Sequence, residues 1–133
     1  MPGYSGTPLP KKLGIKEGFR VRLIDSPPEV LRELKPSLDK CEMTDGKSPL
    51  DFAVVFTRSK ASLTREFKRI TKELAPAGML WVSWPKKSSG VATDLSEDAI
   101  REIGLASGLV DVKVCAVTEV WSGLKFVRRL KDR

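Results

Sequence analysis

The run Phe52-Ala53-Val54-Val55-Phe56 consists entirely of apolar residues. A strand of this kind is buried on both faces, which is typical of a parallel sheet covered by helices on each side. Beyond it, apolar residues repeat at the spacing of a helix, at Leu63, Phe67, Ile70 and Leu74. Pro76 and Gly78 are expected to end that helix before a second strand over Met79–Trp84. The segment therefore predicts a strand–helix–strand unit.

Strands and helices also alternate on the N-terminal side of this unit. A strand is expected over Phe19–Ile24, where apolar and basic residues alternate. The tetrapeptide Ser26-Pro27-Pro28-Glu29 has the residues of a capping box, so a short helix is expected to begin there. Pro36 is expected to end this helix, and a weak strand around Cys41–Thr44 follows.

The C-terminal side continues the alternation. Ser96 is a good helix cap and Gly108 a good helix terminator. Two strands over Val112–Val117 and Leu124–Arg128 then suit an antiparallel hairpin joined through residues 118–123. This order predicts an α/β fold, with a mostly parallel, doubly wound sheet, helices on both faces and a C-terminal antiparallel hairpin.

Length and composition predict one domain. The chain has 133 residues and 41% apolar content, enough for a single packed core. Residues 1–12 are rich in glycine, proline and small hydroxyl residues, which predicts an irregular arm before a single α/β domain over residues 13–133. No apolar run approaches the roughly 20 residues that cross a bilayer, and the start lacks the apolar stretch of a signal peptide. We therefore expect a cytoplasmic protein without a membrane segment.

The ionisable residues exclude several kinds of site. The chain has no histidine, which removes serine–histidine and cysteine–histidine nucleophile pairs and most zinc sites. Cys41 and Cys115 lie far apart in different expected strands, so we expect small core residues and neither a disulfide nor a metal site. The net charge of +7 favours an acidic partner, whether a small anion, an acidic protein or nucleic acid.

A candidate anion site lies where the expected strands end. Trp84-Pro85 ends a strand and leads into Lys86-Lys87-Ser88-Ser89-Gly90, a basic loop rich in hydroxyls. Asp25 and Arg58 follow two other strands. Ligands of open α/β sheets bind beyond the carboxyl ends of the strands, so these loops form one candidate rim. Arginine grips a carboxylate or phosphate with two parallel bonds, and lysines add point charges.

Some side chains near this rim leave alternatives open. Tyr4, Lys11 and Lys12 are expected to close over the rim as a lid, whereas a frayed terminus is the ordinary fate of such an arm. Trp81 and Trp84 point to opposite faces of a regular strand, which favours core packing. Trp121 covers the end of the sheet or meets another chain, and the oligomeric state is unknown.

Several segments resemble a small bacterial family of unknown function. The resemblance lies in Gly3-Tyr4-Ser5-Gly6-Thr7-Pro8-Leu9, Lys11-Lys12-Leu13-Gly14, the Trp84–Leu95 loop, Val114-Cys115-Ala116-Val117 and Trp121-Ser122-Gly123-Leu124. This family supplies no substrate or catalytic residue for this chain.

A more distant resemblance joins the chain to the class I methyltransferase fold, a Rossmann-like sheet. It covers about the last two thirds of the chain, from the Leu50–Phe56 strand through Leu74–Val82 to the helix and hairpin of residues 96–128. The resemblance implies S-adenosylmethionine as cofactor, bound at a glycine-rich loop after the first strand. Here that loop is Asp25-Ser26-Pro27-Pro28, whose prolines lack amide hydrogens and add bulk.

We therefore expect a methyltransferase-like domain that binds an anionic ligand or partner at the carboxyl edge of the sheet, without a standard methyl-donor site. S-adenosylmethionine is disfavoured, no other cofactor is expected, and no enzymatic reaction is assigned. One alternative is a small S-adenosylmethionine-dependent methyltransferase or other transferase. The other is a basic protein associated with nucleic acid, whose binding weakens steeply with added salt.

Overall fold

The computed structural model describes residues 7–44 and 49–133. Within them, one six-stranded sheet has the order β2-β1-β3-β4-β6-β5. Its strands are β1 (Arg20–Ile24), β2 (Glu42–Met43), β3 (Leu50–Phe56), β4 (Leu74–Pro85), β5 (Leu109–Ala116) and β6 (Trp121–Arg128). The strands β2, β1, β3 and β4 pair in parallel, and β6 is antiparallel to both β4 and β5. The predicted mostly parallel α/β fold with a C-terminal hairpin is confirmed.

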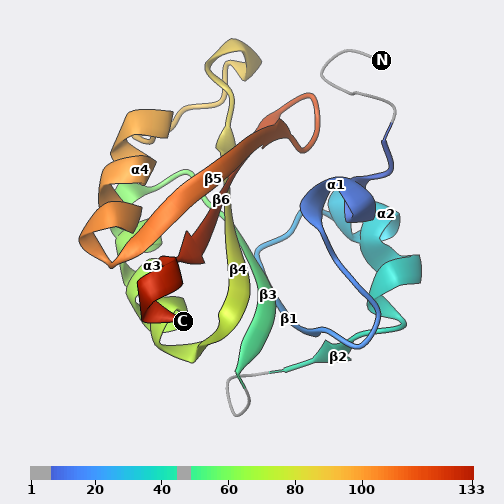
Figure 1. Ribbon diagram of the computed structural model, residues 1–133. Coiled ribbons are helices and arrows are strands. Elements are labelled where there is room, and N and C mark those ends of the chain that lie inside the picture. Colours follow the sequence, from blue (N-terminus) through green and yellow to red (C-terminus); the bar gives the residue numbers. More distant parts are fainter. Residues whose placement is uncertain (1–6, 45–48) are drawn as a thin grey trace.

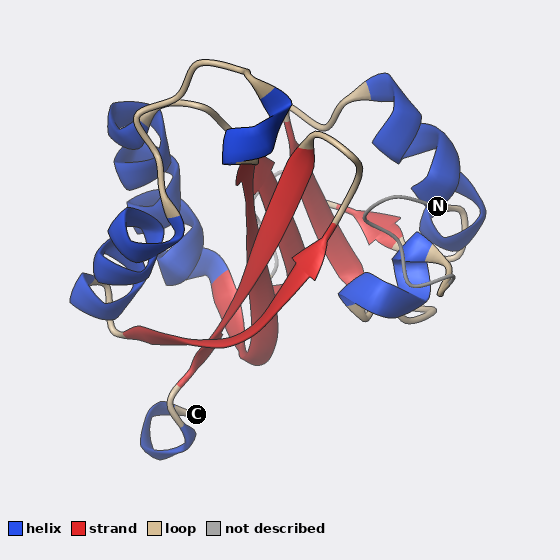
Figure 2. Cartoon of the chain, turned by 90° about the horizontal axis from the view of Figure 1, so that it is seen from above, coloured by secondary structure: helices blue, strands red, loops and turns tan. Residues whose placement is uncertain are grey.

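Four α-helices of the described residues cover the two faces of this sheet. They are α1 (Leu9–Leu13), α2 (Pro28–Leu38), α3 (Lys60–Glu73) and α4 (Glu97–Ala106). Figure 1 shows α3 and α4 on one side of the sheet and α1 and α2 on the other. The same three layers are seen from above in Figure 2. No helix in residues 7–44 and 49–133 is both long and apolar enough to span a membrane.

Each face of the sheet has its own hydrophobic core. Phe67 and Trp84 belong to the core under α3 and α4, and Trp81 belongs to the core under α1 and α2. Trp81 and Trp84 are both buried, with 1% and 6% of their surface exposed. The prediction that these two tryptophans face opposite ways is confirmed, because successive residues of a strand point to opposite faces and the two are three positions apart.

Serine side chains cap the starts of α3 and α4. The Ser59 hydroxyl accepts a hydrogen bond of 3.2 Å from the Ser62 amide at the start of α3. The Ser96 hydroxyl accepts one of the same length from the Ala99 amide at the start of α4. After α4, Gly108 has a φ of 87°, a left-handed conformation that glycine adopts without strain. The predictions that Ser96 begins α4 and that Gly108 ends it are confirmed.

Two predictions about α2 are wrong. Pro27, not Ser26, precedes the helix without a side-chain cap, and the buried Ser26 hydroxyl has no partner among the described residues. The first carbonyl of α2 to accept hydrogen bonds is that of Pro27. It accepts bonds of 3.0 Å from the amides of Val30 and Leu31. The helix also continues through Pro36 to Leu38. A proline this close to the end removes only one late amide bond, so the last turn still closes.

The predicted irregular arm is wrong over its last residues, because Leu9–Leu13 form α1. The fixed φ of proline suits a first helical turn, and Leu9 and Leu13 gain burial in the core. The α1 helix ends at Gly14, which has a φ of 85°. The predicted Tyr4 contact lies outside the described residues. The division into an arm and one domain therefore stays a prediction.

The boundaries of the strands also differ from those predicted, most of all in the last three strands. The β4 strand begins at Leu74 directly after α3, so Pro76 and Gly78 lie within the strand. Gly78 is required there because a side chain would collide with the Leu50 carbonyl oxygen. Residues 117–120, rather than 118–123, connect β5 to β6.

The ion pair between Arg20 and Asp51 leads to a prediction for pH dependence. The Arg20 amide and Nε donate to Asp51 Oδ2 at 2.8 Å and 3.0 Å. These bonds lower the pKa of Asp51 below its ordinary value. Asp51 therefore stabilises the fold fully above the pKa of an unfolded aspartate, about 3.9, and less as pH falls through its lowered pKa.

Urea unfolding of the parent protein and Asp51→Asn between pH 7 and pH 2 measures this contribution. The variant should be less stable at pH 7, and its deficit should shrink on acidification. Asp39→Asn, which removes an exposed carboxylate 3.3 Å from Lys35, is the control and should change little. A deficit in Asp51→Asn that stays constant down to pH 2 would contradict the account.

Candidate functional site

The strands β1, β3 and β4 end side by side at the upper edge of the sheet in Figure 1. From β1 the chain turns into α2 on one face, and from β3 it turns into α3 on the other. The order of strands therefore reverses between β1 and β3. In open α/β sheets a ligand crevice forms at such a reversal, outside the carboxyl ends of the strands.

A hollow of about 640 Å³ lies at this reversal. We call it the switch-point hollow. It is lined by Asp25, Phe56, Thr57, Arg58, Ser59, Ser62, Ala92 and Trp121. Asp25 directly follows β1 and has a φ of 56°, a left-handed conformation that is uncommon for residues other than glycine. The first two strands of the rim thus each contribute one charged residue to the same hollow.

The apolar wall of the hollow is a pair of aromatic rings. Phe56 and Trp121 meet edge to face, with ring centroids 5.2 Å apart and planes at 77°. Phe56 is buried, whereas Trp121 is only partly buried. The structure therefore places Trp121 over the end of the sheet, the first of the two alternatives for this residue. A partly exposed indole at a hollow can pack against a planar ligand.

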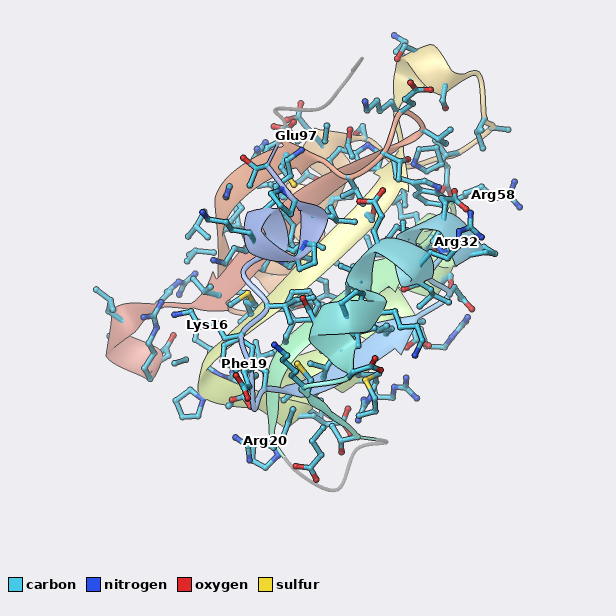
Figure 3. All side chains as sticks on the ribbon, turned by 90° about the vertical axis from the view of Figure 1, so that its right-hand side faces the viewer. Lys16, Phe19, Arg20, Arg32, Arg58 and Glu97 are labelled. Atoms are coloured by element: carbon cyan, nitrogen blue, oxygen red, sulfur yellow. The ribbon has the colours of Figure 1, made fainter. Side chains whose placement is uncertain are left out.

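The loop after β4 is fixed to the loop after β3. The Thr93 hydroxyl donates a 2.6 Å bond to the Arg58 carbonyl, and the Asp94 amide donates to the same oxygen at 3.3 Å. In return, the Lys60 amide donates a 2.7 Å bond to Asp94 Oδ1. These bonds hold the backbone of the Arg58 segment, so its side chain projects from a defined position. Figure 3 shows the Arg58 side chain extending outward from the ribbon.

A second hollow of about 630 Å³ is lined partly by residues of the same loop. We call it the lysine-loop hollow. Its lining includes Trp84, Lys86, Lys87, Gly90 and Glu97, and Ala92 lines both hollows. The predicted basic loop therefore lies next to the switch-point hollow.

The two serines of the basic loop have different positions. Ser89 accepts a 3.2 Å bond from the Val91 amide and donates a 2.6 Å bond to the Lys86 carbonyl. It therefore holds the turn of a short 3₁₀ helix over Lys87–Ser89 that ends at Gly90, with a φ of 76°. Ser88 is exposed. Among these five loop residues, the lysines and the glycine line the hollow.

The two lysines of the predicted lid lie elsewhere. Lys11 lines a third hollow together with Lys16 and Ser37, between α1 and α2. The Lys12 ammonium group donates a 2.9 Å bond to the Ala116 carbonyl at the end of β5. Neither lysine lines the switch-point hollow or the lysine-loop hollow. The lid stays a prediction that now depends on Tyr4, outside the described residues.

Comparisons with known proteins bear on the fold. No protein-family model and no curated protein sequence matches the chain. The solved structures that match include magnesium protoporphyrin IX methyltransferase from Synechocystis PCC 6803 with bound SAH. The TM-score is 0.52 at 13% identity, over 75% of this chain and 59% of that one. A putative methyltransferase from Thermoplasma acidophilum matches with a TM-score of 0.57 at 8% identity, over 87% and 70% of the two chains.

A third structure is the O-methyltransferase NcsB1 from neocarzinostatin biosynthesis, in complex with S-adenosylmethionine and a naphthoic acid. Its TM-score is 0.56 at 12% identity, over 82% of this chain and 41% of that one. At these identities the likeness establishes the fold, a methyltransferase-like Rossmann sheet. The chain spans 59% of the length of the magnesium protoporphyrin IX methyltransferase and 41% of the length of NcsB1. Membership of the bacterial family suggested by the sequence stays a prediction.

NcsB1 binds S-adenosylmethionine, the cofactor that the resemblance to methyltransferases implies. A cofactor held by backbone at this turn needs free amides and close approach. Here Pro27 and Pro28 have no amide hydrogen, and the Val30 and Leu31 amides already bond to the Pro27 carbonyl. Glu29 supplies the one remaining amide of the first turn. The residues of the turn do not fit a cofactor bound in this way.

Proposed function

We propose that the protein binds a small anionic molecule carrying a planar ring, in the switch-point hollow. The observation that carries the proposal is the meeting of Asp25, Arg58 and the Phe56–Trp121 pair in one hollow at the strand reversal. Arg58 would hold a carboxylate or phosphate with paired hydrogen bonds. Trp121 would pack against the ring, and Asp25 would accept a bond from a hydroxyl or amino group.

The basic loop supports this proposal from the neighbouring hollow. Lys86 and Lys87 add positive charge close to the proposed anion without lining the same hollow. Their contribution is therefore attraction of the ligand rather than direct recognition. The proposal also includes a cytoplasmic location for the protein and the binding of an acidic partner. It includes no catalytic step.

A second candidate function is methyl transfer from S-adenosylmethionine. The comparisons favour it more than they favour simple anion binding, since the matched proteins include methyltransferases solved with SAH or S-adenosylmethionine. The turn after β1 lacks the free backbone amides that hold this cofactor in the usual position, so S-adenosylmethionine would have to bind in another way. Calorimetric titration with S-adenosylhomocysteine separates the candidates. We expect a dissociation constant of about 1 mM or weaker, and a low micromolar constant would favour methyl transfer.

Titration with adenosine monophosphate tests the main proposal, because this ligand joins a planar ring, hydroxyls and a phosphate. The parent protein should bind it, and Arg58→Gln should weaken binding about tenfold, the loss of one charge-assisted contact. Lys60→Gln is the matched control, because Lys60 is a nearby exposed cation outside the lining of the hollow. No binding by the parent, or equal weakening in both variants, would contradict the proposal.

The nucleic-acid alternative gives a different result in the same titration. Binding to a single-stranded oligonucleotide through several phosphates loses affinity steeply between 50 mM and 200 mM salt. Adenosine monophosphate carries a single phosphate, so its binding should change less. An oligonucleotide affinity far above that of the mononucleotide, with a steep salt dependence, would favour nucleic acid.

A further inference from the structure

Four lysines gather beside α1, on the sheet face opposite α3 and α4. Lys12 belongs to α1, Lys16 follows it, Lys113 lies in β5 and Lys125 in β6. We call them the lysine cluster. Lys125 pairs in register with Lys113 on one side and with Trp81 on the other. Because Trp81 belongs to the core under α1 and α2, the register places Lys113 and Lys125 on that face.

Two of these lysines are held in place by carbonyl oxygens. The Lys12 ammonium group donates a 2.9 Å bond to the Ala116 carbonyl in β5. The Lys113 ammonium group donates a 3.3 Å bond to the Lys12 carbonyl in α1. These bonds connect α1 to β5 and fix the positions of both cations. A carbonyl carries only a partial negative charge, so the Lys12 carbonyl orients the Lys113 ammonium group without neutralising it.

The cluster concentrates positive charge. Lys113 and Lys125 lie directly opposite each other across an antiparallel pair, an arrangement that destabilises a sheet when the charges are alike. Burial lowers the pKa of Lys125, and the charges of Lys113 and Lys16 lower it further. With the described carboxylates, Lys16, Lys113 and Lys125 form no ion pair.

The thiol of Cys115 lies within the influence of the same charges. Burial raises its pKa, and the positive charges of Lys12 and Lys113 oppose that rise. Lysines from α1, β5 and β6 therefore all act on one region of the sheet face. The positive charges are gathered in this region and are not spread along a single helix or strand. Such a concentration matches a compact anion with several charges better than an extended backbone.

We infer that the lysine cluster is a binding site for the phosphate groups of a small molecule, with a diphosphate as the chemical class. Ammonium groups from three elements would surround the anion as point charges, and binding would remove the repulsion between Lys113 and Lys125. The site is independent of the proposed function. Figure 3 shows Lys16 and Arg58 on opposite sides of the molecule, so the cluster and the switch-point hollow are separate.

Inorganic diphosphate is the probe for this inference. Calorimetry should detect binding to the parent protein, and the melting temperature should rise more with diphosphate than with chloride at equal ionic strength. The double variant Lys113→Gln, Lys125→Gln should bind diphosphate at least about tenfold more weakly. Without ligand, it should melt at or above the parent temperature, because the like-charge pair is gone. That result would show that the lost affinity does not come from unfolding.

The matched control is Lys86→Gln, Lys87→Gln, which removes two cations from the other basic region and should leave diphosphate affinity unchanged. The inference is overturned by a parent that does not bind diphosphate, or by a cluster variant that binds it as well as the parent. Loss of affinity in the control variant instead would assign the anion to the basic loop. Tighter binding of an oligonucleotide, lost in the cluster variant, would replace the small ligand by nucleic acid.

Discussion

Replacing Trp81 by alanine should lower the free energy of unfolding by about 4 kcal/mol, a typical cost for truncating a buried tryptophan. Only 1% of Trp81 is exposed. Its Nε1 also donates a buried 2.8 Å bond to the Leu13 carbonyl, which attaches α1 to the sheet. Urea unfolding measures the loss. Trp121→Ala is the control and should cost less, because Trp121 is partly exposed.

Trp81→Phe separates the hydrogen bond from the packing of the ring. The smaller ring fills most of the space but leaves the Leu13 carbonyl without its partner, so a loss of about 1–3 kcal/mol is expected. This variant should also loosen α1, which carries Lys12, and faster amide hydrogen exchange in α1 would show it. A stability equal to that of the parent in either variant would contradict this role of Trp81.

Gly104→Ala should destabilise the fold by about 2–3 kcal/mol, because the added methyl group has no space. A Cβ at this position of α4 would overlap the ring of Phe126. Phe126 is fully buried and meets Phe67 edge to face, with centroids 5.2 Å apart. The ring therefore cannot move without disturbing the core under α3 and α4. Elsewhere in a helix, the same exchange usually increases stability.

A double-mutant cycle tests this explanation. Phe126→Leu alone creates space and loses packing, and Gly104→Ala in that background should cost much less than in the parent protein. Thermal unfolding of the four proteins gives the coupling energy. Additive effects would show that Gly104 is required for a reason other than its contact with Phe126.

Local patterns predicted the central part of the fold well. The apolar run of β3 and the helical spacing of α3 depend on burial by neighbouring layers, and the structure has those layers. Ser59 and Ser96 cap their helices because each precedes residues with free amides. Ser26 does not have this role because α2 begins at Pro28, so that Pro27 occupies the cap position and Ser26 lies one residue before it.

Long-range packing determined what local patterns missed. The α1 helix has only five residues and forms where Leu9 and Leu13 reach a core built by distant strands. At the candidate site, Asp25 and Arg58 meet because the parallel strands β1 and β3 pair side by side. The lysine cluster depends on the pairing of Lys113 with Lys125 across a register shift between Asp111 and Lys113, which the sequence does not reveal.

The position of Trp121 also depends on long-range packing that local sequence patterns do not reveal. In the sequence it is a residue of a hairpin connection with two open roles. In the structure β6 is inserted between β4 and β5 and runs antiparallel to both, so its first residue lies at the carboxyl edge of the parallel strands. There Trp121 contacts Phe56 and lines the hollow with Arg58. The signal that could have identified it is the antiparallel direction of the last strand.

The indole N–H signals of the three tryptophans provide the most direct test of binding in the switch-point hollow. Trp121 lines that hollow, Trp84 lines the lysine-loop hollow, and the Trp81 indole is bonded to Leu13 as an internal reference. In a two-dimensional NMR titration with adenosine monophosphate, the Trp121 signal should move while the Trp81 signal stays in place, and in Arg58→Gln the same movement should need about tenfold more ligand. A Trp121 signal that stays fixed at saturating ligand, or that moves at the same ligand concentrations in Arg58→Gln, would contradict the account.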